Sequence, residues 1–198
     1  MSKIYKINYS NILKGGNDHI INYINSLYEN TSNINGIYHK IYNTVYGELC
    51  LSQIDRLRKE IDINGYDIFY DLGSGSGKIV CYFALALNIP SIGIEIIDKR
   101  HNIASSIQSR LNSPYLNFLK GDMFDYNFNN GTIFYAYNLT WDHKINQKVI
   151  SKIKNEAKNC KYIILSTHEN HPDVKLFKEI PNINFSSHNS SLYIYTLI

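Results

Sequence analysis

The feature that most constrains this chain is a run of three alternating glycines between an apolar segment and a helical one. The run lies in Asp71-Leu72-Gly73-Ser74-Gly75-Ser76-Gly77-Lys78. Glycines at such a turn let the backbone bend tightly and approach a ligand closely. The helix beyond them offers free N–H groups and the positive end of its dipole. The segment therefore predicts a strand–loop–helix unit that holds a ligand.

Two common nucleotide-binding motifs do not fit this segment. A P-loop needs GxxxxGK followed by Ser or Thr, but Leu72 stands at its first glycine and Ile79 at its hydroxyl position. The dinucleotide motif GxGxxG needs its third glycine where Lys78 stands. The remaining pattern, Asp-x-Gly-x-Gly-x-Gly, puts Asp71 at the end of the strand. A carboxylate there suits a ligand with an ammonium group, such as the methionine part of S-adenosylmethionine.

Two further acids follow the next predicted strands. Glu95 ends the strand after the glycine loop, where a carboxylate can accept both hydroxyls of a ribose. Asp122 follows the third strand and is placed to meet an adenine amino group, with Met123 packed on the ring. The carboxyl ends of parallel strands meet at one edge of a sheet, where ligands bind in open α/β folds. Together with Asp71, these acids predict an S-adenosylmethionine site at that edge.

Hydrophobic periodicity predicts an α/β fold around the loop. Apolar, β-prone segments alternate with stretches of helical spacing, which is typical of a doubly wound, mostly parallel sheet with helices on both faces. We expect strands over 66–72, 91–97, 115–119, 132–139 and 161–167, and helices over 17–29, 50–61, 79–88, 99–111 and 142–158. The tail has three further segments, 174–179, 183–187 and 192–198. Two strands at the end of a chain favour an antiparallel hairpin at one sheet edge.

Composition narrows the class of protein. The 198 residues suit one domain, and a net charge of +3 with interleaved lysines and acids argues against a phosphate-backbone binder. The three cysteines form no CxxC pair, which favours a reducing compartment. The polar first ten residues do not resemble a signal peptide, and no apolar run reaches membrane-spanning length. We expect a soluble protein, intracellular in the cytoplasm or nucleus, without membrane association.

The glycine loop and the acids resemble those of the seven-stranded, Rossmann-like (class I) S-adenosylmethionine-dependent methyltransferases. The resemblance covers roughly residues 45–198 and implies a methyltransferase domain over 46–198, preceded by a helical extension over 1–45. A metal is not expected, because His168 and His171 lack the four-residue spacing of a zinc helix and Pro172 indicates a loop.

A narrower likeness lies upstream, in Val45-Tyr46-Gly47-Glu48. Its order and spacing relative to the glycine loop are similar to those of the histone lysine methyltransferases named for disruption of telomeric silencing. In that family a Tyr-Gly-Glu-Thr loop closes over the cofactor, so the resemblance places Tyr46 and Glu48 in a lid. The predicted cofactor site comprises Tyr46, Glu48, Asp71, Gly73, Ser74, Gly75, Gly77, Lys78, Glu95, Asp122 and Met123. The implied partner is a protein, such as a histone or nucleosome, with weak nucleic-acid binding at most.

The chain departs from that family at several positions. Leu49 replaces the threonine of the lid, and Lys78 replaces a glutamine after the glycine loop. After the fourth strand the family has Asn-Asn-Phe-x-Phe, where this chain has Tyr137-Asn138-Leu139-Thr140-Trp141. The helical N-terminal part is shorter, and no basic tail is present. These departures concern the substrate more than the cofactor.

Methyl transfer to a lysine needs the neutral amine, although the reference pKa of the amine is about 10.4. A narrow aromatic channel favours the neutral form by desolvation. Tyr137, Leu139 and Trp141 are predicted to build that channel, and Asn138 to orient the amine with its side-chain or backbone carbonyl, so the predicted catalytic residues are Tyr137, Asn138 and Trp141. Asn-Pro-Pro-Tyr in the same slot would mark enzymes that methylate adenine or amide nitrogens. Two alternatives stay open: a methyltransferase of the same fold acting on RNA, DNA or a small molecule, and a non-catalytic partner subunit.

Overall fold

The core is a seven-stranded sheet with strand order β3-β2-β1-β4-β5-β7-β6. The computed structural model describes residues 16–29, 47–186 and 188–198. The strands are β1 (Phe69–Leu72), β2 (Ser91–Glu95), β3 (Leu116–Lys120), β4 (Ile133–Ala136), β5 (Tyr162–Leu165), β6 (Val174–Asn184) and β7 (Asn189–Leu197). Strands β1 to β5 are parallel, and β7 runs antiparallel to both β5 and β6. The predicted doubly wound, mostly parallel seven-stranded sheet is confirmed.

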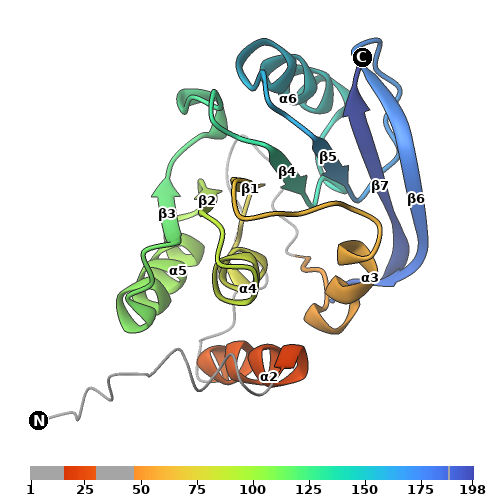
Figure 1. Ribbon diagram of the computed structural model, residues 1–198. Coiled ribbons are helices and arrows are strands. Elements are labelled where there is room, and N and C mark those ends of the chain that lie inside the picture. The colour runs from red at the N-terminus through yellow and green to blue at the C-terminus, as the bar shows by residue number, and fades with distance from the viewer. Residues whose placement is uncertain (1–15, 30–46, 187) are drawn as a thin grey trace, which may run out of the picture.

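Helices cover both faces of this sheet (Figure 1). The described helical segments are α2 (Gly16–Tyr28), η1 (Leu51–Gln53), α3 (Ile54–Arg58), α4 (Lys78–Ala86), α5 (Asp98–Leu111), η2 (Met123–Asp125) and α6 (His143–Glu156). Helices α4 and α5 pack in one apolar cluster, and α6 packs in a second cluster on the opposite face. The helix expected over 50–61 is shorter than predicted, because its first turn is a 3-10 helix and its α-helical part ends at Arg58.

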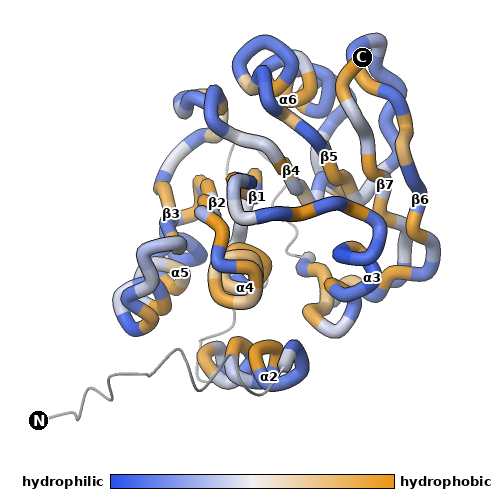
Figure 2. The backbone as a smooth tube through the Cα atoms, viewed as in Figure 1, coloured by the Kyte–Doolittle hydropathy of each residue, from blue (hydrophilic) through white to orange (hydrophobic). Residues whose placement is uncertain are grey.

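Helix α4 is apolar on every side, as Figure 2 shows, because it lies between the sheet and α2. All residues from Ile79 to Leu85 are buried. The predicted N-terminal helix is confirmed as α2, which turns Ile20, Ile24 and Leu27 toward α4. The Tyr28 hydroxyl donates to the backbone oxygen of Ser76 at 2.9 Å. Helix α2 therefore shares the core of the sheet, and the domain boundary near residue 45 stays a prediction.

The predicted C-terminal hairpin is present, but one of its details was wrong. Segments 174–179 and 183–187 were separate in the sequence pattern, whereas β6 runs through from Val174 to Asn184 with two register irregularities. Pro181 and Asn182 made this stretch look interrupted. Pro181 is exposed on the edge strand, where a missing N–H breaks no ladder, and Asn182 takes a positive φ of 55°. A strand with bulges therefore replaces two short segments.

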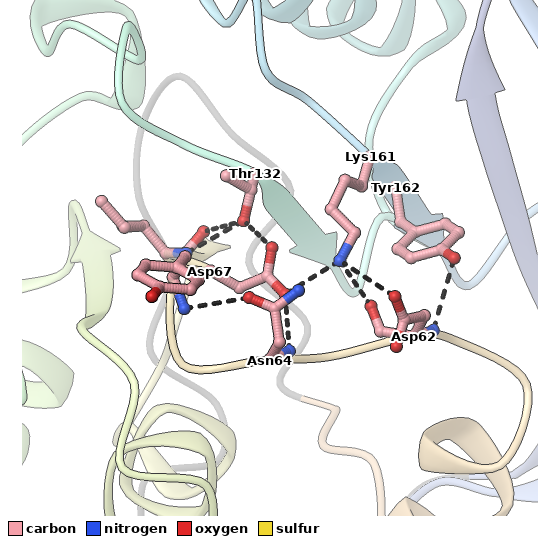
Figure 3. A network of polar contacts seen from close by, with 8 residues as sticks. Asp62, Asn64, Asp67, Thr132, Lys161 and Tyr162 are labelled. Atoms are coloured by element: carbon pink, nitrogen blue, oxygen red, sulfur yellow. Dashed lines mark hydrogen bonds and ion pairs between the residues drawn. The ribbon is translucent and has the colours of Figure 1, made fainter.

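The amino-terminal ends of β1, β4 and β5 are joined by a polar network around Asp67 (Figure 3). The buried Asp67 carboxylate accepts hydrogen bonds from the Asn64 N–H at 2.8 Å and the Thr132 hydroxyl at 2.8 Å. It also accepts one from Lys161 Nζ at 2.9 Å, and Lys161 Nζ donates to the backbone oxygen of Asp62 at 2.7 Å. These contacts tie together the amino-terminal ends of the three strands, at the end of the sheet opposite the glycine loop.

Replacing Asp67 with alanine should lower the free energy of unfolding by about 2–3 kcal/mol, because three donors lose their acceptor in a buried place. Denaturant titration measures the change. The matched control is Asp62→Ala, since Asp62 is 82% exposed and its carboxylate lies 3.8 Å from the same lysine. That control should shift stability by only about 0.5 kcal/mol. Equal losses in the free energy of unfolding for Asp67→Ala and Asp62→Ala would contradict the stabilising role of the Asp67 network.

Candidate functional site

A pocket lies at the carboxyl ends of β1, β2 and β4, where the sequence placed the ligand. The space within its walls, with the open mouth included, is about 920 Å³. The predicted site residues that line it are Glu48, Asp71, Gly73, Ser74, Gly75, Lys78, Glu95, Asp122, Met123, Tyr137 and Trp141. The pocket as a whole is called the cofactor pocket below. Tyr46, predicted for the lid, lies outside the described residues.

The glycine loop has the backbone conformation that its sequence requires. Gly75 and Gly77 have φ angles of 57° and 89°, in the left-handed region that favours glycine. A Cβ on Gly77 would also lie 2.3 Å from the ring of Phe118, so this glycine lets α4 pack closely on β3. Gly73 N–H and Ser74 N–H both donate to the backbone oxygen of Ile94, at 2.9 and 3.0 Å. The loop is thus fixed to β2 while its upper surface faces the pocket.

Glu95 is held at the end of β2 with its carboxylate in the pocket. One carboxylate oxygen accepts from the Gly75 N–H at 2.8 Å and the other from the Ile97 N–H at 2.7 Å. Burial raises the pKa of Glu95, and the Ile97 N–H, the Arg100 charge and the Gly75 N–H oppose that rise. A carboxylate has about four lone-pair sites. Glu95 therefore keeps acceptor capacity for a pair of ribose hydroxyls.

Asp71 places a carboxyl group in the pocket. Its side chain is buried, and burial raises its pKa well above the usual range, with the charges of Glu95 and Glu48 raising it further. Three carboxylates in one pocket repel one another, so a cation placed among them gains a strong attraction. This electrostatic field suits a ligand that carries an ammonium and a sulfonium group.

Cofactor binding should tighten as the pH rises from the ordinary carboxyl range through the raised pKa of Asp71. The protonated carboxyl has no charge to attract an ammonium group, so binding of the cation favours the ionised form and releases a proton. Calorimetry of S-adenosylhomocysteine binding in buffers of different ionisation enthalpy measures that proton. Asp71→Asn should remove the dependence on pH. An affinity that stays flat or falls across this pH range in the unaltered protein would contradict the assignment.

Two buried hydroxyl groups in the pocket have no hydrogen-bond partner among the described residues. They are Ser74 Oγ and Tyr135 OH, which belong to two residues that line the cofactor pocket. Tyr135 lies beside Asp71 in the register of β4 and β1. Buried polar groups are normally satisfied, so orphaned ones in a pocket point to a ligand with donors and acceptors of its own. The residues present therefore fit S-adenosylmethionine: acids for its cations and hydroxyls, and free hydroxyl groups for its remaining polar atoms.

Residues 47–50 are the described part of the segment that the family resemblance predicts to be a lid, and this segment is called the lid below. Their backbone pairs with the turn of the β6–β7 hairpin: the Ser186 N–H donates to Glu48 O at 2.7 Å and the Cys50 N–H donates to Asn184 O at 3.1 Å. The Glu48 carboxylate accepts from Ser76 Oγ and Lys78 Nζ, both at 2.9 Å. The lid thus connects the hairpin to the glycine loop. Lys78, which departs from the family pattern, is the ion-pair partner that the lid uses here.

Tyr137 and Trp141 line the pocket on the side of β4. A Cβ on Gly47 would lie 2.3 Å from the Tyr137 ring, so the lid backbone rests directly on this aromatic side chain. Trp141 lies against the glycine loop, 3.8 Å from a Cβ on Gly73. The two rings form an aromatic side of the pocket, and the substrate channel stays a prediction. Leu139, expected in the same channel, is not among the lining residues and is 43% exposed.

Asn138 has a different place from the one predicted. Its side chain is fully buried and bonded to residues that directly follow β5 and to Asn146 of α6, and it is not among the residues that line the pocket. Side chains point to opposite faces in turn along extended backbone. Tyr135 and Tyr137 therefore lie on the pocket side, whereas Ala136 and Asn138 lie on the side of α6, where Asn138 bonds to Asn146. A direct role for Asn138 with the substrate amine stays a prediction to which this geometry gives no support.

Several lining residues were missed by sequence reasoning. Tyr135 and Arg100 line the pocket but were not among the predicted site residues. The signal for Tyr135 was present, since it is two residues before Tyr137 on the same strand face. Asp122, in contrast, was found: it caps η2 by accepting from the Phe124 N–H at 3.0 Å and lines the pocket together with Met123.

Two kinds of feature were sought and not found in the described part of the chain. Over residues 16–29, 47–186 and 188–198, no group of three or more His, Cys, Asp or Glu side chains is arranged to hold a metal ion. None of the helices in these ranges is long and apolar enough to cross a membrane.

The fold and the pocket together define a class I, S-adenosylmethionine-binding methyltransferase. Residues 23–195 match the family described as "Histone methylation protein DOT1". The chain belongs to this family, which confirms the likeness seen in the lid and glycine loop, and with it the predicted cofactor.

Curated relatives are distant in sequence. The chain is 24% identical over 178 residues to a histone-lysine N-methyltransferase specific for H3 lysine-79 from Caenorhabditis elegans. That match covers 81% of this chain but spans only 19% of the nematode protein. The chain is 25% identical over 146 residues to a protein-lysine N-methyltransferase from Saccharolobus islandicus, covering 73% of this chain and 88% of the relative.

Solved structures with the same fold include methyltransferases of other substrate classes. An RNA methyltransferase from Salinibacter ruber, in complex with S-adenosylhomocysteine, superposes with a TM-score of 0.61 at 20% identity and covers 74% of this chain and 90% of that one. A tRNA methyltransferase from Bacillus subtilis superposes with a TM-score of 0.54 at 13% identity over 68% and 61% of the two chains. At these identities the likeness supports the fold and not the substrate.

Proposed function

We propose that this chain is an S-adenosylmethionine-dependent protein lysine methyltransferase that acts on a histone or nucleosome. The observation that carries the proposal is the lid, whose Glu48 is tied to Ser76 and Lys78 of the glycine loop. This arrangement joins the family's lid motif to its glycine motif within one pocket. The match to the DOT1 family and the two lysine methyltransferase relatives support the same substrate class.

The residues of the pocket have separate tasks in this proposal. When bound, the cofactor supplies the methyl group and the leaving group, so the protein has to align the amine and control its protonation. Asp71, Glu95 and Asp122 bind the cofactor's polar groups from the ends of three strands. Tyr137 and Trp141 wall the approach on the side of β4, and their aromatic rings lower the pKa of an entering ammonium group by excluding water.

The direct test is methyl transfer from tritium-labelled S-adenosylmethionine to nucleosomes, free histones, bulk RNA, DNA and a cell lysate. We expect label in a histone band, and the loss of that label when one histone lysine is changed to arginine. Label confined to RNA or DNA would overturn the lysine assignment.

The alternative substrate is a base or amide nitrogen. The polar-then-aromatic order of residues 138–141 favours it. Against it stand the missing prolines and the buried Asn138 side chain, whose amide is already bonded within the protein. A non-catalytic partner subunit is disfavoured because the acids and glycines of the pocket are all present. Cofactor binding without methyl transfer to any acceptor would support the hypothesis of a non-catalytic partner subunit.

A further inference from the structure

Behind the pocket wall lies a second polar cluster that the cofactor does not need. It joins the carboxyl ends of β4 and β5 to the first turn of α6, on the face opposite α4. Its buried members are Asn138, Asn146, Ser166 and Glu169, and Thr167 is half-buried. Buried polar side chains lower stability unless each has a hydrogen-bond partner. Apolar residues would pack as well in this place, so we looked for a role of the cluster in the neighbouring pocket.

Asn138 is the centre of this cluster. Its Oδ1 accepts from the Ser166 N–H at 2.9 Å, the Thr167 N–H at 3.0 Å and the Ser166 hydroxyl at 3.1 Å. Its Nδ2 donates to Thr167 Oγ1 at 2.6 Å and to Asn146 Oδ1 at 3.2 Å. Both donors and the acceptor of the amide are used within the protein. The end of β4 is therefore fixed to the end of β5 and to α6.

Glu169 completes the cluster from the segment that follows β5. One of its carboxylate oxygens accepts from Asn146 Nδ2 and, at 3.2 Å, from Thr167 Oγ1. The other lies 3.6 Å from His143 Nδ1 in the first turn of α6. The Glu169 N–H donates to the Tyr195 hydroxyl at 2.6 Å, which holds the glutamate backbone against β7. A buried carboxylate thus fixes the orientation of the Asn146 amide, and through it that of Asn138.

The cluster acts on the pocket through residues 138–141. The Trp141 N–H donates to the backbone oxygen of Asn138 at 3.1 Å, which closes a tight turn. Thr140 and Trp141, at the far end of that turn, line the cofactor pocket. We propose that Glu169 and Asn146 are positioning residues, which hold Asn138 and thereby set Trp141 in the wall of the pocket. The inference depends on the cofactor site alone, so it stands or falls separately from the choice of substrate.

The experiment uses Trp141 itself, because it is the chain's single tryptophan. Its fluorescence reports the position of the pocket wall in the whole 198-residue chain. In Glu169→Ala, the acrylamide quenching constant should rise about twofold, and the emission change on adding S-adenosylhomocysteine should be lost, because the wall opens locally. Glu169→Gln, whose amide oxygen still accepts from Asn146 and Thr167, should retain both properties. With a methyl acceptor in hand, Glu169→Ala should lower kcat about 100-fold through misplacement of the wall.

Two further variants separate positioning from stability. Asp67→Ala removes a buried, triply bonded carboxylate at the opposite edge of the sheet and should leave Trp141 quenching unchanged. Thr167→Val removes the hydroxyl that bonds both Asn138 and Glu169 while it keeps the volume, so it should repeat the Glu169→Ala effect even if that variant fails to fold. Unchanged quenching in folded Glu169→Ala and Thr167→Val would overturn the inference. So would an equal change in Asp67→Ala.

Discussion

Gly75→Arg should abolish cofactor binding, with the affinity for S-adenosylhomocysteine falling more than about 100-fold, or about 2.7 kcal/mol. Gly75 lies in the wall of the pocket with a φ of 57°, a conformation that costs other residues about 1–2 kcal/mol. The new side chain would also bring a positive charge to the pocket of Asp71 and Glu95, where the cation of the cofactor belongs. Calorimetry measures the loss directly.

The matched control is the same replacement at Gly65. This glycine is exposed, and nothing lies within 4 Å of a Cβ built on it. It belongs to the turn between Asn64 and Asp67 that precedes β1, at the end of the sheet opposite the glycine loop. Gly65→Arg should therefore bind the cofactor with unaltered affinity. If Gly75→Arg also binds normally while folded, the glycine loop is not the cofactor site.

Trp141→Ala should have the largest effect on turnover: we expect kcat to fall about 100-fold while the affinity for S-adenosylhomocysteine changes only about threefold. The indole lies against the glycine loop and lines the pocket. Its removal admits water and leaves the amine without an aromatic wall, so the ammonium form is retained. Rates on the acceptor found in the labelling panel, compared with binding by calorimetry, measure the two effects separately.

Two variants serve as references for this change. Trp141→Phe keeps an aromatic wall and should recover most of the rate. Tyr66→Ala removes an aromatic side chain that is 95% exposed on the far edge and should leave the rate unaltered. If Trp141→Ala lowers affinity as much as turnover, the indole belongs to cofactor binding and not to a substrate channel.

The cofactor half of the site could be predicted from the sequence because it depends on strand ends. Asp71, Glu95 and Asp122 each follow a parallel strand, and the topology of such a sheet brings those ends together whatever the loops do. The glycine spacing identified the turn for the same reason. This prediction required only the local residue pattern and the order of the strands along the chain.

The substrate half could not be predicted as well, because it depends on which way single side chains face. The position of Asn138 in the motif after β4 suggested a substrate contact. A shift of one residue in extended backbone turns a side chain to the opposite face, and Asn138 points to α6 instead of the pocket. Tyr135 lies beside Asp71 only because β4 pairs with β1, which the pattern of one strand does not reveal. The course of β6 through Pro181 depended on an edge position that no local pattern reveals.

The measurement that tests the central claim most directly is the chemical identity of the methylated product. Lysate labelled with tritiated S-adenosylmethionine would be separated into protein and nucleic acid, and the protein hydrolysed to amino acids. We predict that the label elutes as methyllysine with the unaltered protein and is absent with Gly75→Arg. Label in a methylated nucleoside, or in an amino acid other than lysine, would contradict the account.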